Sequence, residues 1–289
     1  MATSLNMKAS DAIIDAHHHL WRYSYAEYSW MGEDPGAPGR DFLGPDLTRL
    51  LDEQGVSGTV AVQARESLEE NRFLLEQATI EPRIRGIVGW VPFRETNVHG
   101  AIEGLAENPL FKGVRHILQG EPDMASFIEL ETFNAGLETL RRTGLRYDLL
   151  VVADQLASTL RLVDRHPDLP MVVDHIAKPL IAGAPDANWA RQMREIAQRP
   201  NVCCKLSGLV TEVPGWVWTP ELLRPYFETV LEAFGPKRLM FGSDWPVCLW
   251  ASPYGRWLAT VREFIKNLSA EEQDWILARS ACEFYGLKI

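Results

Sequence analysis

The chain has 289 residues, 46% of them hydrophobic, which is long enough for one α/β barrel of about 250 residues or for two smaller domains. Its formal charge of −10 argues against nucleic acid and anionic membranes as partners, because both attract clustered Lys and Arg. The ordinary apolar content excludes a disordered chain.

Residues 1–11 are polar and lack the apolar core of a signal peptide, and no apolar run approaches the ~20 residues that span a bilayer. The four cysteines, Cys203, Cys204, Cys248 and Cys282, show no C-x-x-C spacing. We therefore expect reduced thiols, a cytoplasmic location and a small-molecule substrate. The oligomeric state is left open.

Short apolar runs rich in Val and Ile alternate with longer amphipathic segments, which is typical of parallel strands joined by crossover helices. The predicted strands are residues 12–16, 58–65, 84–91, 113–118, 146–152, 171–176, 202–207 and 238–243. Predicted helices between them include residues 68–80, 127–142, 155–166, 189–199 and 220–234. Eight such alternations predict a single (β/α)8 TIM-barrel domain over residues 1–289. A doubly wound open sheet is the alternative, because periodicity does not show closure.

The segment 23–40 follows the first predicted strand and contains three glycines, two prolines and several aromatic residues. It is too irregular for a helix, and long loops at this end of a barrel often cover a site. We predict a lid there, with Trp30 contacting the substrate; a passive surface loop is the alternative. Trp90, Trp216 and Trp218 are further candidates for a pocket wall.

Polar residues gather where the predicted strands end, which is where barrel enzymes place their active sites. These clusters are His17-His18-His19, Gln63-Ala64-Arg65, Arg115-His116, Asp174-His175, Lys205-Leu206-Ser207 and Ser243-Asp244-Trp245. Because the strands of one parallel barrel all end at the same rim, the clusters are predicted to share one pocket.

His17 and His19 should project to the same side, because side chains alternate along a strand, and His18 should point away. A third imidazole from His175 or His116, with the carboxylate of Asp244, would complete a ligand set that suits Zn²⁺. Such an ion lowers the pKa of a bound water to about 7. The simpler alternatives are surface polarity for the His-x-His pair and a helix cap for Asp244.

The remaining candidates are side chains that could contact the substrate or act on it. Gln63, Arg65, Arg115 and Lys205 can donate to substrate oxygens, although structural salt bridges would explain them too. His116 is a candidate catalytic residue, as are His175 and Asp244; Arg115 is the alternative inward residue next to His116.

Six motifs together resemble the amidohydrolase superfamily, specifically its branch of sugar-lactone and pyrone-dicarboxylate lactonases, and most of all the L-fuconolactonases. The motifs are residues 14–21 (IDAHHHLW), 62–65 (VQAR), 114–119 (VRHILQ), 173–179 (VDHIAKP), 204–209 (CKLSGL) and 241–248 (FGSDWPVC). They cover nearly the whole chain. Their combination is specific, whereas His-x-His alone is not.

This resemblance implies a distorted (β/α)8 barrel that acts as a carboxylic ester hydrolase and opens a lactone ring. It implies that His17, His19 and Asp244 hold or replace a divalent metal, with His175 beside them, and that Asp244 shuttles the proton of the attacking water. No lysine is placed to bridge two metals, so we expect one ion, most simply Zn²⁺, or metal-independent catalysis. The few arginines favour a neutral sugar lactone, such as L-fuconolactone, over a dicarboxylate.

Two other functions remain open at this point. A metal-dependent decarboxylase of the same superfamily would carry the same His-x-His pair and terminal aspartate. A non-catalytic binding barrel is the third reading. The sequence contains no Gly-x-Ser-x-Gly motif that would indicate a covalent serine mechanism.

Overall fold

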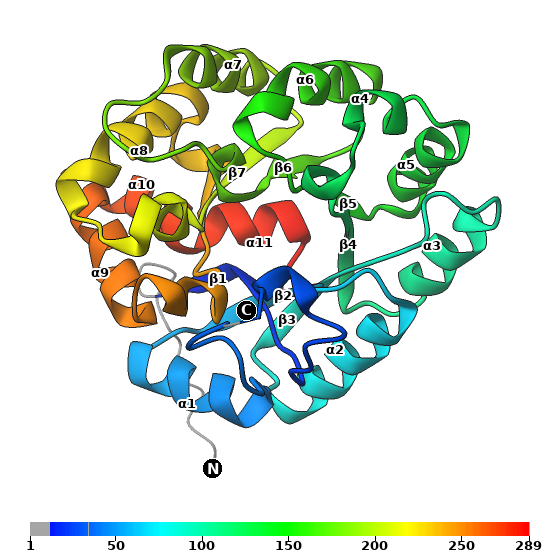
Figure 1. Ribbon diagram of the computed structural model, residues 1–289, viewed down its shortest axis with the longest axis horizontal. Coiled ribbons are helices and arrows are strands. Elements are labelled where there is room, and N and C mark those ends of the chain that lie inside the picture. The colour runs from blue at the N-terminus through cyan, green and yellow to red at the C-terminus, as the bar shows by residue number, and fades with distance from the viewer. Residues whose placement is uncertain (1–11, 34, 289) are drawn as a thin grey trace.

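The structure is a computed structural model that describes residues 12–33 and 35–288, so the polar segment expected at residues 1–11 lies outside the described residues. Eight strands form one sheet in which every strand pairs in parallel with the next along the chain (Figure 1). The strands are β1 (Ile14–His18), β2 (Gly58–Val62), β3 (Ile84–Gly89), β4 (Phe111–His116), β5 (Arg146–Leu149), β6 (Met171–Val173), β7 (Val202–Leu206) and β8 (Leu239–Phe241).

The sheet closes where the end of β1 meets the segment that follows β8. The backbone N–H of Asp244 donates to the carbonyl of His17 at 2.8 Å, and the N–H of His19 donates to the carbonyl of Trp245 at 2.6 Å. His18 and Trp245 accordingly form a parallel bridge. The predicted (β/α)8 barrel is therefore confirmed, and the open sheet is excluded.

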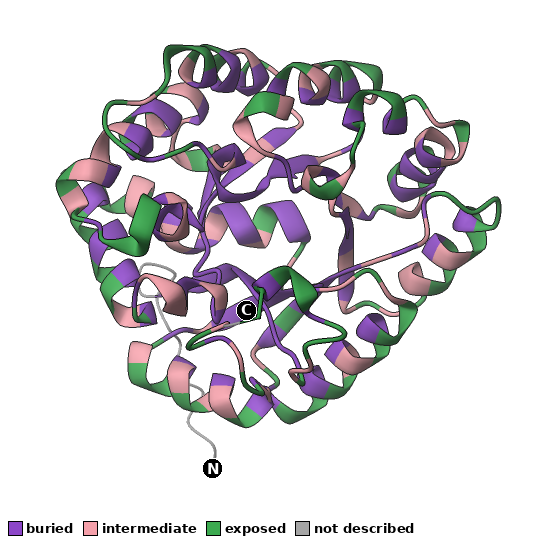
Figure 2. Ribbon diagram, viewed as in Figure 1, coloured by how far each residue is buried: buried purple, intermediate pink, exposed green. Residues whose placement is uncertain are grey.

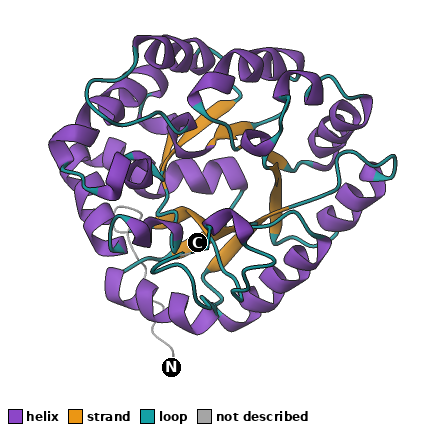
Figure 3. Cartoon of the chain, in the orientation of Figure 1, coloured by secondary structure: helices purple, strands orange, loops and turns teal. Residues whose placement is uncertain are grey.

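Helices surround the strands as an outer layer, whereas the last helix along the chain lies inside this layer (Figure 3). They are α1 (Gly44–Gln54), α2 (Leu68–Ile80), α3 (Val98–Ala106), α4 (Met124–Phe127), α5 (Glu131–Thr143), α6 (Leu156–Arg165), α7 (Ala187–Ala197), α8 (Pro220–Phe234), α9 (Tyr254–Ile265), α10 (Ala270–Asp274) and α11 (Ser280–Tyr285). Local sequence explains several helix starts. The Ser67 hydroxyl accepts from the N–H of Glu69 at the start of α2, and Pro220 stands in the first turn of α8 after the Thr219 cap.

Most predicted elements agree with the structure in type but differ from it by a few residues in their bounds. Two of these differences have a clear local reason. The helix expected over 127–142 is divided into α4 and α5, because the Asn134 amide donates to the carbonyls of Ile128 and Leu130, both at 2.8 Å, and holds that connection out of a helix. The last strand, expected over 238–243, ends at Phe241. Beyond it, the backbone of Asp244 takes a positive φ of 57°, which no strand accommodates.

Apolar side chains fill both the space between strands and helices and the interior of the barrel. Figure 2 shows that the strands and parts of the surrounding helices consist of buried residues. Inside, Ile14 and Val60 pack with Phe284 and Tyr285 of α11. Figure 1 shows α11 lying across the centre of the barrel. The Arg146 guanidinium at the start of β5 donates to the carbonyl of Phe284 at 2.5 Å. The C-terminal helix therefore closes the amino end of the barrel and leaves the carboxyl end for a site.

The loop 23–40 is irregular as predicted, apart from one short 3-10 turn at Ser29–Met31. The Trp250 indole N–H donates to the carbonyl of Pro35 at 2.6 Å, and the Trp21 indole donates to the carbonyl of Arg40 at 2.9 Å. These bonds hold the loop against the carboxyl end of the barrel.

Within the described residues, no helix combines the length and apolarity needed to cross a membrane.

Candidate active site

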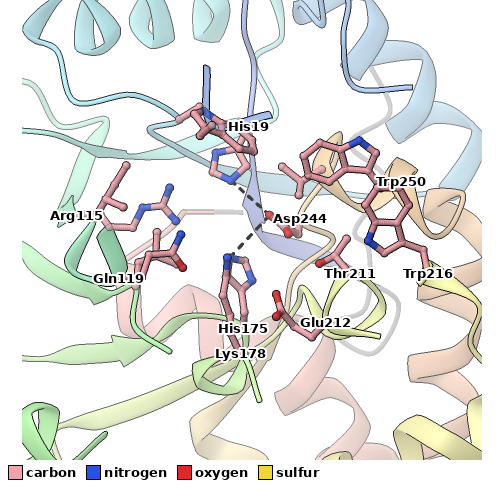
Figure 4. Close-up of a pocket in the computed structure, with 15 residues that line it drawn as sticks. His19, Arg115, Gln119, His175, Lys178, Thr211, Glu212, Trp216, Asp244 and Trp250 are labelled. Carbon is pink, nitrogen blue, oxygen red and sulfur yellow. Dashed lines mark ion pairs between the residues drawn. The ribbon is translucent and has the colours of Figure 1, made fainter. Parts of the chain in front are cut away.

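Three imidazoles and one carboxylate meet at the carboxyl end of the barrel. Figure 4 shows two of the imidazoles, those of His19 and His175, on either side of Asp244. The Oδ1 atom of Asp244 lies 3.4 Å from Nε2 of His19 and 3.8 Å from Nε2 of both His17 and His175. The two Nε2 atoms of His17 and His19 are 3.2 Å apart. Potential ligand atoms from the ends of β1, β6 and β8 therefore gather around the Asp244 carboxylate.

Each of the three imidazoles is oriented by a contact at its other nitrogen. Nδ1 of His19 lies 2.8 Å from the carbonyl of Val62, Nδ1 of His175 lies 2.8 Å from the Ser207 hydroxyl, and Nδ1 of His17 lies 3.3 Å from Oδ1 of Asp174. A carbonyl oxygen can only accept a hydrogen bond, so Nδ1 of His19 must carry the proton. Its Nε2 then presents a lone pair toward the cluster. His18 points away and contacts the Thr59 hydroxyl at 3.0 Å.

Unusual backbone conformations aim two of these side chains. Asp244 has φ 57°, and the run His175, Ile176, Ala177 and Lys178 has φ values between 45° and 60°. Gly208 must be glycine here: its φ is 69°, and a Cβ would lie 2.6 Å from Nδ1 of His175. Non-glycine residues in left-handed conformations concentrate at functional sites, where the surroundings hold them.

Burial sets the protonation states of the cluster. It lowers the pKa of His17 and His19, and that of His175 to about 4, so the imidazoles are neutral near pH 7. Burial alone would raise the pKa of Asp244, but interactions with His175 and His19 outweigh it and lower that pKa below its usual value. The cluster therefore combines neutral nitrogen donors with an ionised carboxylate.

This donor set fits a divalent metal ion. Two ligand atoms bound tetrahedrally to zinc at about 2.0–2.1 Å lie roughly 3.3 Å apart. The separations of 3.2 to 3.8 Å within the cluster are close to that value. His17, His175 and Asp244 also satisfy the spacing of a three-ligand group. The nitrogens and single carboxylate match the preference of zinc and similar ions.

A second polar network lies beneath His17. The ammonium of Lys205 is fully buried and contacts Oδ2 of Asp148 at 2.5 Å, Oδ1 of Asp174 at 3.0 Å and Nδ1 of His17 at 3.1 Å. The Tyr285 hydroxyl also donates to Oδ2 of Asp148, at 2.8 Å. Burial raises the pKa of Asp148 to about 6, although Lys205 opposes that rise. The network fixes His17 from below through charge-assisted contacts.

Above the cluster is a cavity of about 420 Å³ with two contrasting walls. In Figure 4, Arg115 and Gln119 lie on one side, and Trp216 and Trp250 lie on the other. Trp216 stacks on Trp250, with ring centres 5.6 Å apart. The cavity is lined by His19, Trp30, Ala64, Arg115, Ile117, Gln119, Leu150, His175, Lys178, Thr211, Glu212, Trp216, Asp244, Val247 and Trp250.

Residues 14–287 match the amidohydrolase family. The chain belongs to this family. An L-fucono-1,5-lactonase from Burkholderia multivorans is 38% identical over 95% of this amidohydrolase and 96% of its own length, and one from Burkholderia ambifaria is 37% identical over 94% of both. A crystal structure of an amidohydrolase from B. multivorans with bound zinc superposes with a TM-score of 0.91 at 38% identity, covering 96% of this chain and 100% of the other. The resemblance found in the motifs is confirmed.

The structure of the amidohydrolase brings six predicted site residues together. His17, His19, His175 and Asp244 form the cluster, with His17 fully buried at its floor. Arg115 and Trp30 line the cavity above them. The Asp244 carboxylate faces the imidazoles, so the alternative of a helix cap for this side chain does not apply.

Four other predicted residues of the amidohydrolase do not line the cavity, because their polar groups have partners elsewhere. His116 contacts Glu66 and Glu121 at 3.0 and 2.7 Å and stacks on Phe127. Arg65 forms ion pairs with Glu27 and Glu70. The Gln63 amide donates to the carbonyl of Arg115, and Lys205 lies in the network beneath His17. Trp90 and Trp218 also lie outside the cavity lining, whereas Trp216 belongs to it.

Several residues of the amidohydrolase site were missed by sequence reasoning. Gln119, Lys178, Thr211, Glu212 and Trp250 line the cavity from loops that follow β4, β6, β7 and β8. The sequence did indicate that these residues lie near the site, since each follows the carboxyl end of a strand by no more than about ten residues. It could not indicate which of them face the cavity, because loops lack the periodicity that shows side-chain orientation. Asp148, within a buried strand, was also missed.

Proposed function

We propose that this amidohydrolase opens the ring of a neutral sugar lactone, L-fucono-1,5-lactone or a similar aldonolactone, to give the aldonic acid. The observation that carries the proposal is the Asp244 carboxylate facing three neutral imidazoles at the floor of a cavity with one polar and one aromatic wall. The near full-length likeness to two L-fucono-1,5-lactonases supports the same substrate class.

The roles we assign follow from position. Asp244 is ionised and buried, so it can take a proton from a water molecule that attacks the lactone carbonyl. Arg115 lies with Nη1 3.4 Å from Nε2 of His17 and places positive charge where the carbonyl oxygen becomes negative. Trp30, Trp216 and Trp250 offer ring faces to the apolar side of the sugar. The proton taken by Asp244 returns to the ring oxygen when the ring opens.

We propose one divalent ion, zinc, as the cofactor. His17, His175 and Asp244, whose ligand atoms all lie within 4.8 Å of one another, would hold it together with His19, which lies 3.4 Å from Asp244. The known chemistry of such an ion is to polarise the carbonyl and lower the pKa of a nearby water. The zinc in the B. multivorans amidohydrolase supports this choice.

Incubation of the purified protein with a panel of sugar lactones is expected to release one proton per ring opened, since the product acid has a pKa far below 7. A weakly buffered pH indicator follows the reaction directly, and L-fucono-1,5-lactone should be among the best substrates. Consumption of a pyrone dicarboxylate without acidification of the sugar lactones would contradict the substrate class. Release of CO2 without ring opening would assign the site to a decarboxylase instead.

Protein purified without chelators is expected to contain close to one zinc per chain by elemental analysis. Exchange of His175 for alanine removes one proposed ligand and should lower the bound metal at least about 10-fold. The matched variant His99→Ala, on an exposed position of α3, should keep full occupancy. Full lactonase activity in a rigorously metal-free preparation would contradict the cofactor and assign polarisation of the carbonyl to the histidines themselves.

A further inference from the structure

The polar side chains around the cavity differ in whether they already have partners. The Nη atoms of Arg115 donate to Asp174 and Gln63, and the Thr211 hydroxyl donates to the carbonyl of Gly208 at 2.8 Å. Three further side chains, those of Gln119, Lys178 and Glu212, form no hydrogen bond or ion pair with any residue that the structure describes. These three can satisfy their hydrogen-bonding groups only with water or a ligand.

Glu212 is held firmly despite this lack of a side-chain partner. It ends the short 3-10 turn Leu209–Glu212 after β7, and its carbonyl accepts from the N–H of Ile181 at 3.1 Å. That bond joins the loop after β7 to the loop after β6, which carries Lys178. Figure 4 shows Glu212 and Lys178 on the same side of the cavity as His175. The carboxylate and the ammonium are therefore carried by two connected loops.

The chemistry of this wall suits a polyhydroxylated, uncharged ring. A carboxylate accepts hydrogen bonds from sugar hydroxyls, and an amide and an ammonium donate to them. Besides its histidines, the lining contains four acidic or basic side chains, Arg115, Lys178, Glu212 and Asp244, and Arg115 already forms an ion pair with Asp174 at 3.0 Å. A substrate that carries its own carboxylate would be repelled by the carboxylates of Glu212 and Asp244. Within the described lining, Lys178 is the remaining cation without an ion-pair partner that could attract it.

We propose that Glu212 is the specificity-determining residue of the site: its carboxylate accepts hydrogen bonds from the hydroxyls of a neutral lactone and excludes lactones that bear a carboxylate. This inference rests on the proposed function and deepens it, because it names the feature of the substrate that is read. Lys178 carries a positive charge, so it partly offsets the repulsion between Glu212 and a lactone that bears a carboxylate.

The test compares two lactones of the same ring size, one neutral and one whose terminal carbon is a carboxylate. Glu212→Gln keeps the size of the side chain and removes its charge. We expect the KM for the neutral lactone to rise about 10-fold with kcat nearly unchanged, because a hydrogen bond to a charged acceptor is replaced by a weaker one. The inhibition constant of the anionic lactone should fall by at least roughly 10-fold, because a like charge is removed.

Two further variants complete the test. Lys178→Met removes the opposing charge, so it should weaken binding of the anionic lactone more than that of the neutral one. Glu228→Gln changes a matched carboxylate on an exposed position of α8 and should alter neither constant.

The outcomes separate this inference from the proposed function. If the wild-type protein opens neutral lactones and Glu212→Gln leaves both constants unchanged, the inference is wrong and the function stands. A collapse of kcat at unchanged KM would also overturn it, since Glu212 would then act in the chemistry. If the wild type opens no sugar lactone at all, both fail together.

Discussion

Exchange of Asp244 for asparagine is expected to lower kcat on the sugar lactone by at least about 100-fold, the effect typical of losing a general base. Asparagine has nearly the same shape but cannot accept the proton of the attacking water. The wild-type carboxylate is well suited to that role, because its lowered pKa keeps it ionised throughout the neutral range. The fall should appear in kcat and kcat/KM alike, since the interaction forms in the transition state.

The control for this variant is Asp168→Asn, which changes an exposed aspartate that precedes the amino end of β6, outside the cavity lining, and should leave turnover unchanged. Circular dichroism should show an intact fold for both variants. Metal content must be measured in Asp244→Asn, because loss of a ligand would also lower activity. If Asp244→Asn retains its metal and acidifies the lactone as fast as the wild type, Asp244 is not the base.

Exchange of Lys205 for methionine is expected to lower the free energy of unfolding by about 3–5 kcal/mol, as breaking a buried ion pair typically does. Methionine fills similar volume, but Asp148 and Asp174 would lose the ammonium that contacts them at 2.5 and 3.0 Å. All three side chains are fully buried, so water cannot replace the missing cation. Urea denaturation of metal-free wild type and variant measures the difference.

The loss of unfolding free energy caused by Lys205→Met should be larger at alkaline than at acidic pH. The pKa of Asp148 in the folded protein is already raised to about 6, so folding is favoured when this group is protonated and loses that contribution as pH rises through 6. Without Lys205 the pKa rises further, and the variant should therefore be least stable relative to the wild type at about pH 8 and recover part of the loss at about pH 5.

Lys266→Met provides the matched control, because Lys266 pairs with Glu263 on the surface, where ion pairs contribute little. Its stability should change by less than about 0.5 kcal/mol. An equal effect of the two lysine substitutions would contradict the structural role of Lys205. A deficit that is larger at acidic than at alkaline pH would contradict the assignment to the two carboxylates.

The fold and the reactive cluster were predictable because they follow from local rules. Alternation of apolar strands with amphipathic segments indicated eight parallel strands, and the closed barrel then brought their carboxyl ends to one rim. His17 and His19 are two residues apart at the end of β1, and the Nε2 atoms of both come within 3.8 Å of Asp244. Because all strands of the barrel end at the same rim, His17 and His19 at the end of β1 could be predicted to lie near Asp244, which follows β8.

Which polar residue faces the cavity was decided by tertiary contacts between positions far apart in the chain. Lys205 and His116 both follow the strand-end rule, yet Asp148 neutralises Lys205 across 57 residues, and Glu66, from the segment after β2, contacts His116 at 3.0 Å. The carboxylate partners lie in other elements, so the pattern around each residue could not show that its charge was already satisfied. The same limit explains why these two residues were expected in the pocket.

The sequence by itself determined the barrel, the family and the His17, His19, His175 and Asp244 cluster, because periodicity and strand ends are properties of neighbouring residues. Arg115 and Trp30 of the wall above that cluster were also predicted, but only the tertiary structure decided that Lys178 and Glu212 belong to this wall. Lys178 reaches it through a left-handed run that residue preferences disfavour, and Glu212 reaches it through a loop held by the N–H of Ile181. Such conformations are stabilised by the packed surroundings rather than by local preference, so they exist only once the chain has folded.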